Sequence, residues 1–138
     1  MSSPIEKDLS KANKWYVGKA RTYELRYFVK QYDIWRTALT DLNLYYASVP
    51  KEVRVQRTHD TDHVDRLVAS ISYYQDRIDL VNQALAAVDP LISKPILISV
   101  MSDISYDKLI AKYDIPYGRD LFYDKVRQFI WTLDKLRK

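Results

Sequence analysis

Cysteine is absent from this chain of 138 residues, which excludes both a disulfide framework and a thiolate metal site. Only two glycines and five prolines are present, too few for the many tight turns that a sheet protein needs. No apolar run approaches the roughly 18 residues of a membrane span. The polar N-terminal sequence MSSPIEKDLS also lacks the apolar core of a secretory signal. We therefore expect a soluble, intracellular, all-α protein.

The charge of the chain is small and unevenly distributed. The formal net charge is +4, and residues 59–100 carry three basic and six acidic side chains, so both ends are basic and the middle is acidic. A basic end attracts polyanions such as DNA. Ordinary solvated charge explains a net value this small about as well.

Apolar side chains recur every seven residues in two long segments. The first repeat predicts one helix from about Arg21 to Tyr46, about 39 Å long at 1.5 Å per residue. The second predicts a helix that begins with Thr61 or Asp62 as N-cap and ends at Asp89, before a proline. The repeats are Leu25, Tyr32, Leu39 and Tyr46 beside Phe28, Trp35, Leu42 and Val49, then Val64, Ile71, Ile78 and Leu85 beside Leu67, Tyr74, Val81 and Val88.

Two long amphipathic helices joined by a basic stretch are expected to fold back as an antiparallel hairpin, and a seam shared between subunits is the alternative. The aromatic seam residues Tyr32, Trp35 and Tyr74 fit poorly between two tightly packed helices, which favours a wider bundle or a homodimer. We assign residues 1–90 to this hairpin and oligomerisation region. A short helix before it would bring Trp15 and Tyr16 against the bundle.

Residues 91–138 are predicted to form three short helices. SKPILISVMSD gives a mostly buried helix, and the next has Ser105 as its N-cap and buries Leu109, Ile110 and Tyr113. The last helix, after Gly118, has one apolar stripe: Phe122, Val126, Phe129, Ile130 and Leu133. Its outward side chains are expected to be Asp120, Asp124, Arg127 and Gln128.

Helix, turn and helix with a polar outer face is the arrangement of a DNA-binding helix-turn-helix, although plain helical hairpins share the spacing. Ile115 would fill the turn and Gly118 would open the recognition helix. The base-reading candidates are Arg119, Asp120, Tyr123, Asp124 and Arg127, because Arg can pair with guanine and Asp with cytosine. The candidates for phosphate contacts are Lys108, Lys112, Tyr117 and Lys125.

The segment ISYDKLIAKYDIPYGRDLFYDKVRQFIWTLDKL resembles the C-terminal part of the late transcriptional regulators of phages and prophages of Gram-positive bacteria, the RinA-like and ArpU-like group. The matching residues run from Ile115 to Asp134. The resemblance implies a DNA-binding activator of late phage genes in the cytoplasm of a bacterial host, with a helix-turn-helix like that of sigma-factor region 4. The family often has a denser Arg run where this chain has Lys125-Val126-Arg127.

Other constellations point to less specific chemistry. His59, Asp60, Asp62 and His63 could share a metal, but acidic residues at a helix start are better explained as caps. Without a nucleophile elbow or a phosphate-binding glycine loop we expect no enzyme activity and no cofactor. Trp131 points away from its own stripe and would dock on the bundle or on a second subunit. Two rival functions remain: a small terminase subunit, and an adaptor that binds RNA polymerase or another regulator.

Overall fold

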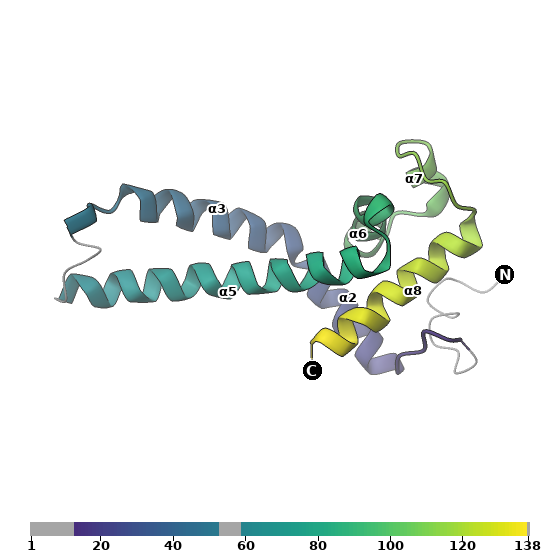
Figure 1. Cartoon of the computed structure of the whole chain (residues 1–138), viewed down its shortest axis with the longest axis horizontal. Coiled ribbons are helices and arrows are strands. Elements are labelled where there is room, and N and C mark those ends of the chain that lie inside the picture. Colours follow the sequence, from purple (N-terminus) through teal and green to yellow (C-terminus); the bar gives the residue numbers. More distant parts are fainter. Residues whose placement is uncertain (1–12, 53–58, 138) are drawn as a thin grey trace. The chain divides into compact units, whose positions relative to one another are not determined.

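The computed structural model describes residues 13–52 and 59–137, and every regular element in these ranges is a helix (Figure 1). The prediction of an all-α fold is therefore confirmed. The helices are α2 (Lys19–Lys30), α3 (Tyr32–Ser48), α5 (His59–Val88), the short 3-10 helix η1 (Pro90–Ile92), α6 (Ser93–Ser102), α7 (Tyr106–Ile110) and α8 (Arg119–Leu136).

The chain divides into two compact units. Of the described residues, the α8 unit contains those up to Gln31 and those from Leu80 onward, and the α3 unit contains those between Tyr32 and Asp79. This division differs from the expected boundary at residue 90. The physical reason is that α2, from the beginning of the chain, packs against α6 and α8 and so completes their core.

The core of the α8 unit forms where α2, α6 and α8 meet, with α7 packed against α6 and α8. All five residues of the predicted α8 stripe are buried, which confirms the periodicity of this helix. The apolar side chains that are completely buried come from five elements, α2, α5, η1, α6 and α8: Leu25, Val29, Val81, Ala84, Ile92, Ile96, Val100, Phe122, Phe129 and Leu133. Burial of large side chains such as Phe129 typically contributes about 1.5–3 kcal/mol each.

The expected single helix over residues 21–46 is interrupted at Gln31. The backbone N–H of Gln31 donates to the carbonyl of Phe28, at 3.2 Å, in a tighter turn than the α-helix makes. The side-chain amide of Gln31 donates instead to the carbonyl of Tyr27, at 3.3 Å, which the backbone N–H would reach in an unbroken helix. The side chain thus satisfies the carbonyl that the break releases, and neither a proline nor a glycine is needed.

The α3 unit contains two helical segments, α3 and the first part of α5, which lie side by side in Figure 1. The Tyr45 hydroxyl lies 3.1 Å from Nε2 of His63, and their rings meet edge to face with centroids 5.9 Å apart. Tyr32, Trp35, Val64 and Leu67 are buried at the predicted seam positions. Other seam positions, such as Leu39, are half-exposed.

Helix α5 begins at His59, two to three residues before the predicted caps Thr61 and Asp62. The side chains of His59, Asp60 and Thr61 lie outside the described residues. At its other end α5 stops at Val88, and Asp89 follows in an extended conformation, as expected before a proline. In the described ranges, no helix combines the length and apolarity needed to cross a membrane.

Candidate nucleic-acid interface

Helices α7 and α8 are joined by an eight-residue connection, residues 111–118, that is packed around Ile115. Ile115 is buried, as the sequence predicts for a residue that fills the turn. The backbone N–H groups of Lys112 and Tyr113 both donate to the Leu109 carbonyl, at 3.0 and 2.8 Å, and close the end of α7. Gly118 is the N-cap residue of α8, and its carbonyl accepts the first intrahelical hydrogen bond from Phe122 at 2.9 Å.

Ile110 is exposed, whereas the sequence predicted that it would be buried. It is 44% exposed, whereas Leu109 beside it is 2% exposed. Helix α7 is only five residues long, so a single side of it faces the core and Leu109 occupies that side. Tyr113, also predicted to be buried, is half-exposed.

Tyrosine side chains hold α7 and the connection against α8. The Tyr106 hydroxyl donates to the carbonyl of Tyr117 at 2.6 Å, and the Tyr106 backbone N–H donates to the Tyr123 hydroxyl at 3.0 Å. The predicted N-cap Ser105 does occupy that position, but its side chain makes no capping hydrogen bond. The Tyr123 oxygen satisfies a free N–H of the helix start instead.

Asp89, directly after the end of α5, contacts both the connection between α7 and α8 and helix α8 itself. Its Oδ2 atom accepts a hydrogen bond from the Tyr117 hydroxyl at 2.7 Å and lies 3.3 Å from Nζ of Lys125. Its Oδ1 atom accepts from the Leu91 backbone N–H at 3.0 Å. The hydrogen bond from Tyr117 lowers the pKa of Asp89 and, reciprocally, raises the pKa of Tyr117. Two predicted phosphate ligands, Tyr117 and Lys125, are therefore already engaged by a carboxylate.

The first turn of α8 is exposed, as are Lys135 and Leu136 at the other end of this helix. Arg119, Asp120 and Leu121 are all exposed, whereas Tyr123 is half-buried and uses its hydroxyl on α7. An Nη atom of Arg119 lies 2.5 Å from the Asp107 carboxylate, and this hydrogen bond raises the pKa of the guanidinium. Leu121, which sequence reasoning did not select, is 47% exposed and adds an apolar contact surface.

Arg127 is a correction to the predicted site. It is 7% exposed and lines a small hollow with Trp15, Val17, Thr22 and Ile130. One Nη atom lies 3.3 Å from Asp124, which is half-exposed. The outward orientation expected for Arg127 is wrong because the segment before α2 packs over this side of α8.

Trp131 lies against the same segment. Its ring meets Trp15 edge to face, with centroids 5.1 Å apart. Trp131 therefore docks on the segment before α2, where the sequence predicted the long bundle or a second subunit. In residues 13–18 the structure has turns and extended backbone, so the short helix expected there does not include Trp15 and Tyr16.

Three exposed lysines surround α7 and its connection to α8. Lys108 and Lys112 were predicted to contact phosphates, and both are exposed. Lys94, on α6, joins them: its Nζ atom lies 5.8 Å from the centroid of the Tyr113 ring, and that of Lys112 lies 5.7 Å from the same centroid. Sequence reasoning missed Lys94 because it precedes the helix-turn-helix pattern.

The exposed carboxylates Asp107, Asp114 and Asp120 lie in the same stretch of chain. They reduce the attraction of this surface for a polyanion, since like charges repel at short range.

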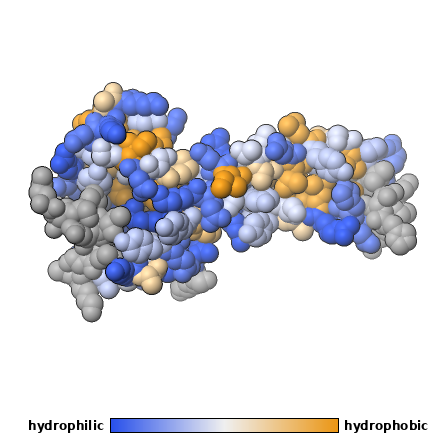
Figure 2. All heavy atoms as spheres, turned by 180° about the vertical axis from the view of Figure 1, so that it is seen from behind, coloured by the Kyte–Doolittle hydropathy of each residue, from blue (hydrophilic) through white to orange (hydrophobic). Residues whose placement is uncertain are grey.

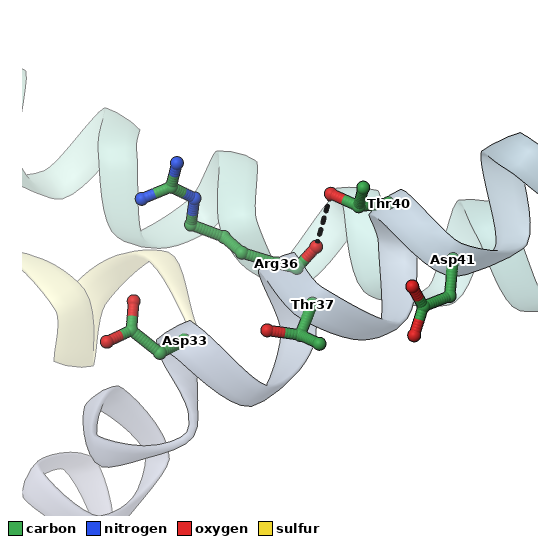
Figure 3. Close-up of a pocket in the computed structure, with 5 residues that line it drawn as sticks. All are labelled: Asp33, Arg36, Thr37, Thr40 and Asp41. Atoms are coloured by element: carbon green, nitrogen blue, oxygen red, sulfur yellow. Dashed lines mark hydrogen bonds between the residues drawn. The ribbon is translucent and has the colours of Figure 1, made fainter.

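A separate hollow of about 420 Å³ lies on α3 and is lined by Asp33, Arg36, Thr37, Thr40 and Asp41 (Figure 3). All five side chains come from this one helix, and the Thr40 hydroxyl donates to the Arg36 carbonyl at 2.9 Å. Among the described residues no group of three or more histidine or acidic side chains is arranged to hold a metal ion. The hollow has neither a buried polar group nor a ligand cluster directed into it.

No family model, curated protein or solved structure matches the chain. The resemblance of residues 115–134 to phage late regulators therefore stays a prediction.

Proposed function

We propose that this protein is a sequence-specific regulator of transcription that binds duplex DNA through the first turn of α8. The observation that carries this proposal is the exposure of Arg119, Asp120 and Leu121 at the start of α8, because residues 122–134 of this helix are buried or half-buried and exposed side chains return only at Lys135 and Leu136. In a helix-turn-helix, the N-terminal residues of the second helix are those that contact base edges. The proposal assigns that position to these three residues.

The chemistry of the first turn fits a mixed base sequence. Arg119 can donate two hydrogen bonds to O6 and N7 of guanine, and Asp120 can accept one from N4 of cytosine. Leu121 offers an apolar contact for a thymine methyl group. Asp107 restrains the Arg119 guanidinium in the free protein, so the side chain is positioned before it meets DNA and part of its ordering entropy is already lost.

The α3 unit is proposed to form an antiparallel helical hairpin that pairs with a second copy of itself. Seven-residue periodicity along both helices is typical of helices that share a seam. Figure 2 shows apolar side chains on the surface of this unit, and Ile34, Leu44 and Val68 are 66%, 67% and 42% exposed. A dimer would bury such side chains and present two α8 helices to two half-sites. Analytical ultracentrifugation tests this: a monomer at micromolar concentration refutes it.

The biological setting is proposed from the resemblance alone. It places the protein in the cytoplasm of a bacterial host as an activator of late phage genes. The proposal that the protein has no catalytic activity and no cofactor depends instead on the lack of catalytic motifs in the sequence, and contact with host RNA polymerase is a further part of the proposal. Exposed carboxylates such as Asp114 and Asp120 would suit contacts to basic polymerase surfaces.

A DNA selection experiment tests the proposed function. The purified protein is mixed with sheared phage and host DNA at near-physiological salt, and the retained fragments are sequenced. We expect one fragment upstream of late genes to be enriched, and Arg119→Ala to abolish this enrichment. The control is Lys135→Ala, which removes an exposed cation from the other end of α8 and should leave the enrichment intact.

The rival functions predict different results. Enrichment of a packaging site, together with ring-shaped oligomers, would identify a small terminase subunit. The exposed carboxylates beside the first turn of α8 favour, as a second candidate, an adaptor that binds a basic protein surface. Absence of enrichment together with a weak salt dependence would favour that adaptor, because true DNA binding weakens steeply as salt rises.

A further inference from the structure

Lys94 and Lys112 flank one aromatic ring on the surface of the α8 unit. Their Nζ atoms lie 5.8 and 5.7 Å from the centroid of Tyr113. Lys94 belongs to the first turn of α6, whereas Lys112 and Tyr113 follow α7 directly. The three side chains therefore come from segments 18 residues apart that α6 and α7 bring together by packing on each other.

The backbone holds this group in place. Lys112 and Tyr113 both donate their backbone N–H to the carbonyl of Leu109, and Leu109 is 2% exposed. The backbone that carries the ring is thus held by a buried residue of α7. Attraction of an ammonium group to an aromatic face restrains each lysine near that ring.

The lysines of this group differ from other cations near α8 in lacking a carboxylate partner among the residues that the structure describes. Lys125 is paired with Asp89, and Arg119 with Asp107. Within the described part of the chain, neither Lys94 nor Lys112 forms a salt bridge with a carboxylate. Both are exposed, so their ammonium groups are accessible to an anion.

We propose that Lys94 and Lys112, positioned by Tyr113, bind phosphodiester groups of duplex DNA beside the base-reading turn. This inference rests on the proposed function and adds a second segment, α6, to the DNA-binding surface. Lysine acts on phosphate as a compact point charge and carries no base specificity. The group therefore fixes the position of α8 on the duplex, while Arg119 and its neighbours select the sequence.

The test measures the salt dependence of DNA binding. Fluorescence anisotropy gives the Kd of the selected duplex, and of an unrelated duplex, over a series of KCl concentrations. Each phosphate contact removed should reduce the slope of log K against log salt by about 0.9. We expect this change for Lys94→Ala and for Lys112→Ala, about twice the change for the double variant, and equal losses on both duplexes.

Matched variants distinguish the loss of a phosphate contact from a general loss of charge or of helical structure. Lys19→Ala removes an exposed lysine at the start of α2, which lies far from α7 in the α8 unit (Figure 1), and should leave the slope unchanged. Tyr113→Phe keeps the ring and should behave like the wild type. Tyr113→Leu removes the ring and should weaken binding with both lysines still present. Far-UV circular dichroism confirms that each variant retains its helices.

Two results would overturn the inference in distinguishable ways. If the wild-type protein binds the selected duplex with a steep salt slope, and neither Lys94→Ala nor Lys112→Ala alters it, the phosphate assignment is wrong and the proposed function stands. If the wild type shows no salt-dependent binding to either duplex, the proposed function fails, and the phosphate assignment fails with it.

Discussion

Replacing Arg127 tests most directly whether this residue of α8 belongs to the core or contacts DNA. A residue that reads DNA can be truncated without loss of stability, whereas a buried residue cannot. Arg127 is 7% exposed and is surrounded by Trp15, Val17, Thr22 and Ile130. We therefore expect Arg127→Ala to lower the free energy of unfolding of the α8 unit.

The magnitude follows from the atoms removed. Truncation to alanine deletes two buried methylene groups, which contribute about 0.8 kcal/mol each, and leaves a hole where the guanidinium lay. Asp124 has a side chain that is 43% exposed, so it recovers water when its partner is lost and adds little to the cost. The total is about 2 to 3 kcal/mol. Arg127→Met keeps most of the side-chain volume and should cost under about 1 kcal/mol.

Tryptophan fluorescence during urea unfolding measures this difference. Trp15 and Trp131 are in edge contact beside Arg127, whereas Trp35 belongs to the α3 unit. A Trp35→Phe background therefore makes the signal specific to the α8 unit. An unchanged free energy of unfolding for Arg127→Ala, combined with a loss of DNA binding, would refute the burial argument and restore Arg127 as a contact residue.

Three further changes test other parts of the α8 unit. Phe129→Ala empties a completely buried site and should cost about 3 to 5 kcal/mol in the same urea experiment; a stability equal to that of the wild type would contradict its place in the core. Leu109→Ala should cost about 2 to 5 kcal/mol, whereas Ile110→Ala, at a side chain that is 44% exposed, should stay within about 0.5 kcal/mol, and equal costs would reject the observed orientation of α7. Asp89→Asn removes the charge that faces Lys125. Because the folded-state pKa of Asp89 lies below its ordinary value of 3.8, its ionised form stabilises the fold above about that pH and loses this effect as the pH falls through the folded pKa. The variant should therefore be less stable than the wild type at pH 7, with a gap that narrows below pH 3.8, and a gap independent of pH would rule out a role for the charge.

The sequence predicts well what depends on one helix alone. The stripe from Phe122 to Leu133 is buried as its spacing requires, Gly118 opens α8, and Ile115 is buried in the turn. These features follow from helical periodicity and capping, which are local properties of the chain.

The features that the sequence did not predict depend on contacts between distant segments. Residues 15–17 cover one side of α8, and that contact places Arg127 inside. Asp89 reaches Tyr117 and Lys125 only because η1 and α6 return the chain toward the turn. Lys94 reaches Tyr113 for a similar reason. Periodicity shows which face of a helix is apolar but not which other segment covers its polar side.

The break at Gln31 has a different origin. The seven-residue repeat continues through it without a proline or a glycine, so the pattern gives no sign of an interruption. The hydrogen bond from the Gln31 side chain to the Tyr27 carbonyl stabilises the break. The hydrogen bond that the Gln31 side chain makes to a backbone carbonyl can be seen only in the structure.

The central claim is that the first turn of α8, and not its C-terminal end, contacts DNA. Photo-crosslinking tests it directly: p-benzoylphenylalanine replaces either Leu121 or Leu136, which are 47% and 38% exposed at the two ends of the same helix. Each protein is irradiated with the duplex recovered by selection. We expect an efficient protein–DNA crosslink from position 121 and none above background from position 136. Crosslinking from position 136 alone, or from neither position while the duplex is bound, would contradict it.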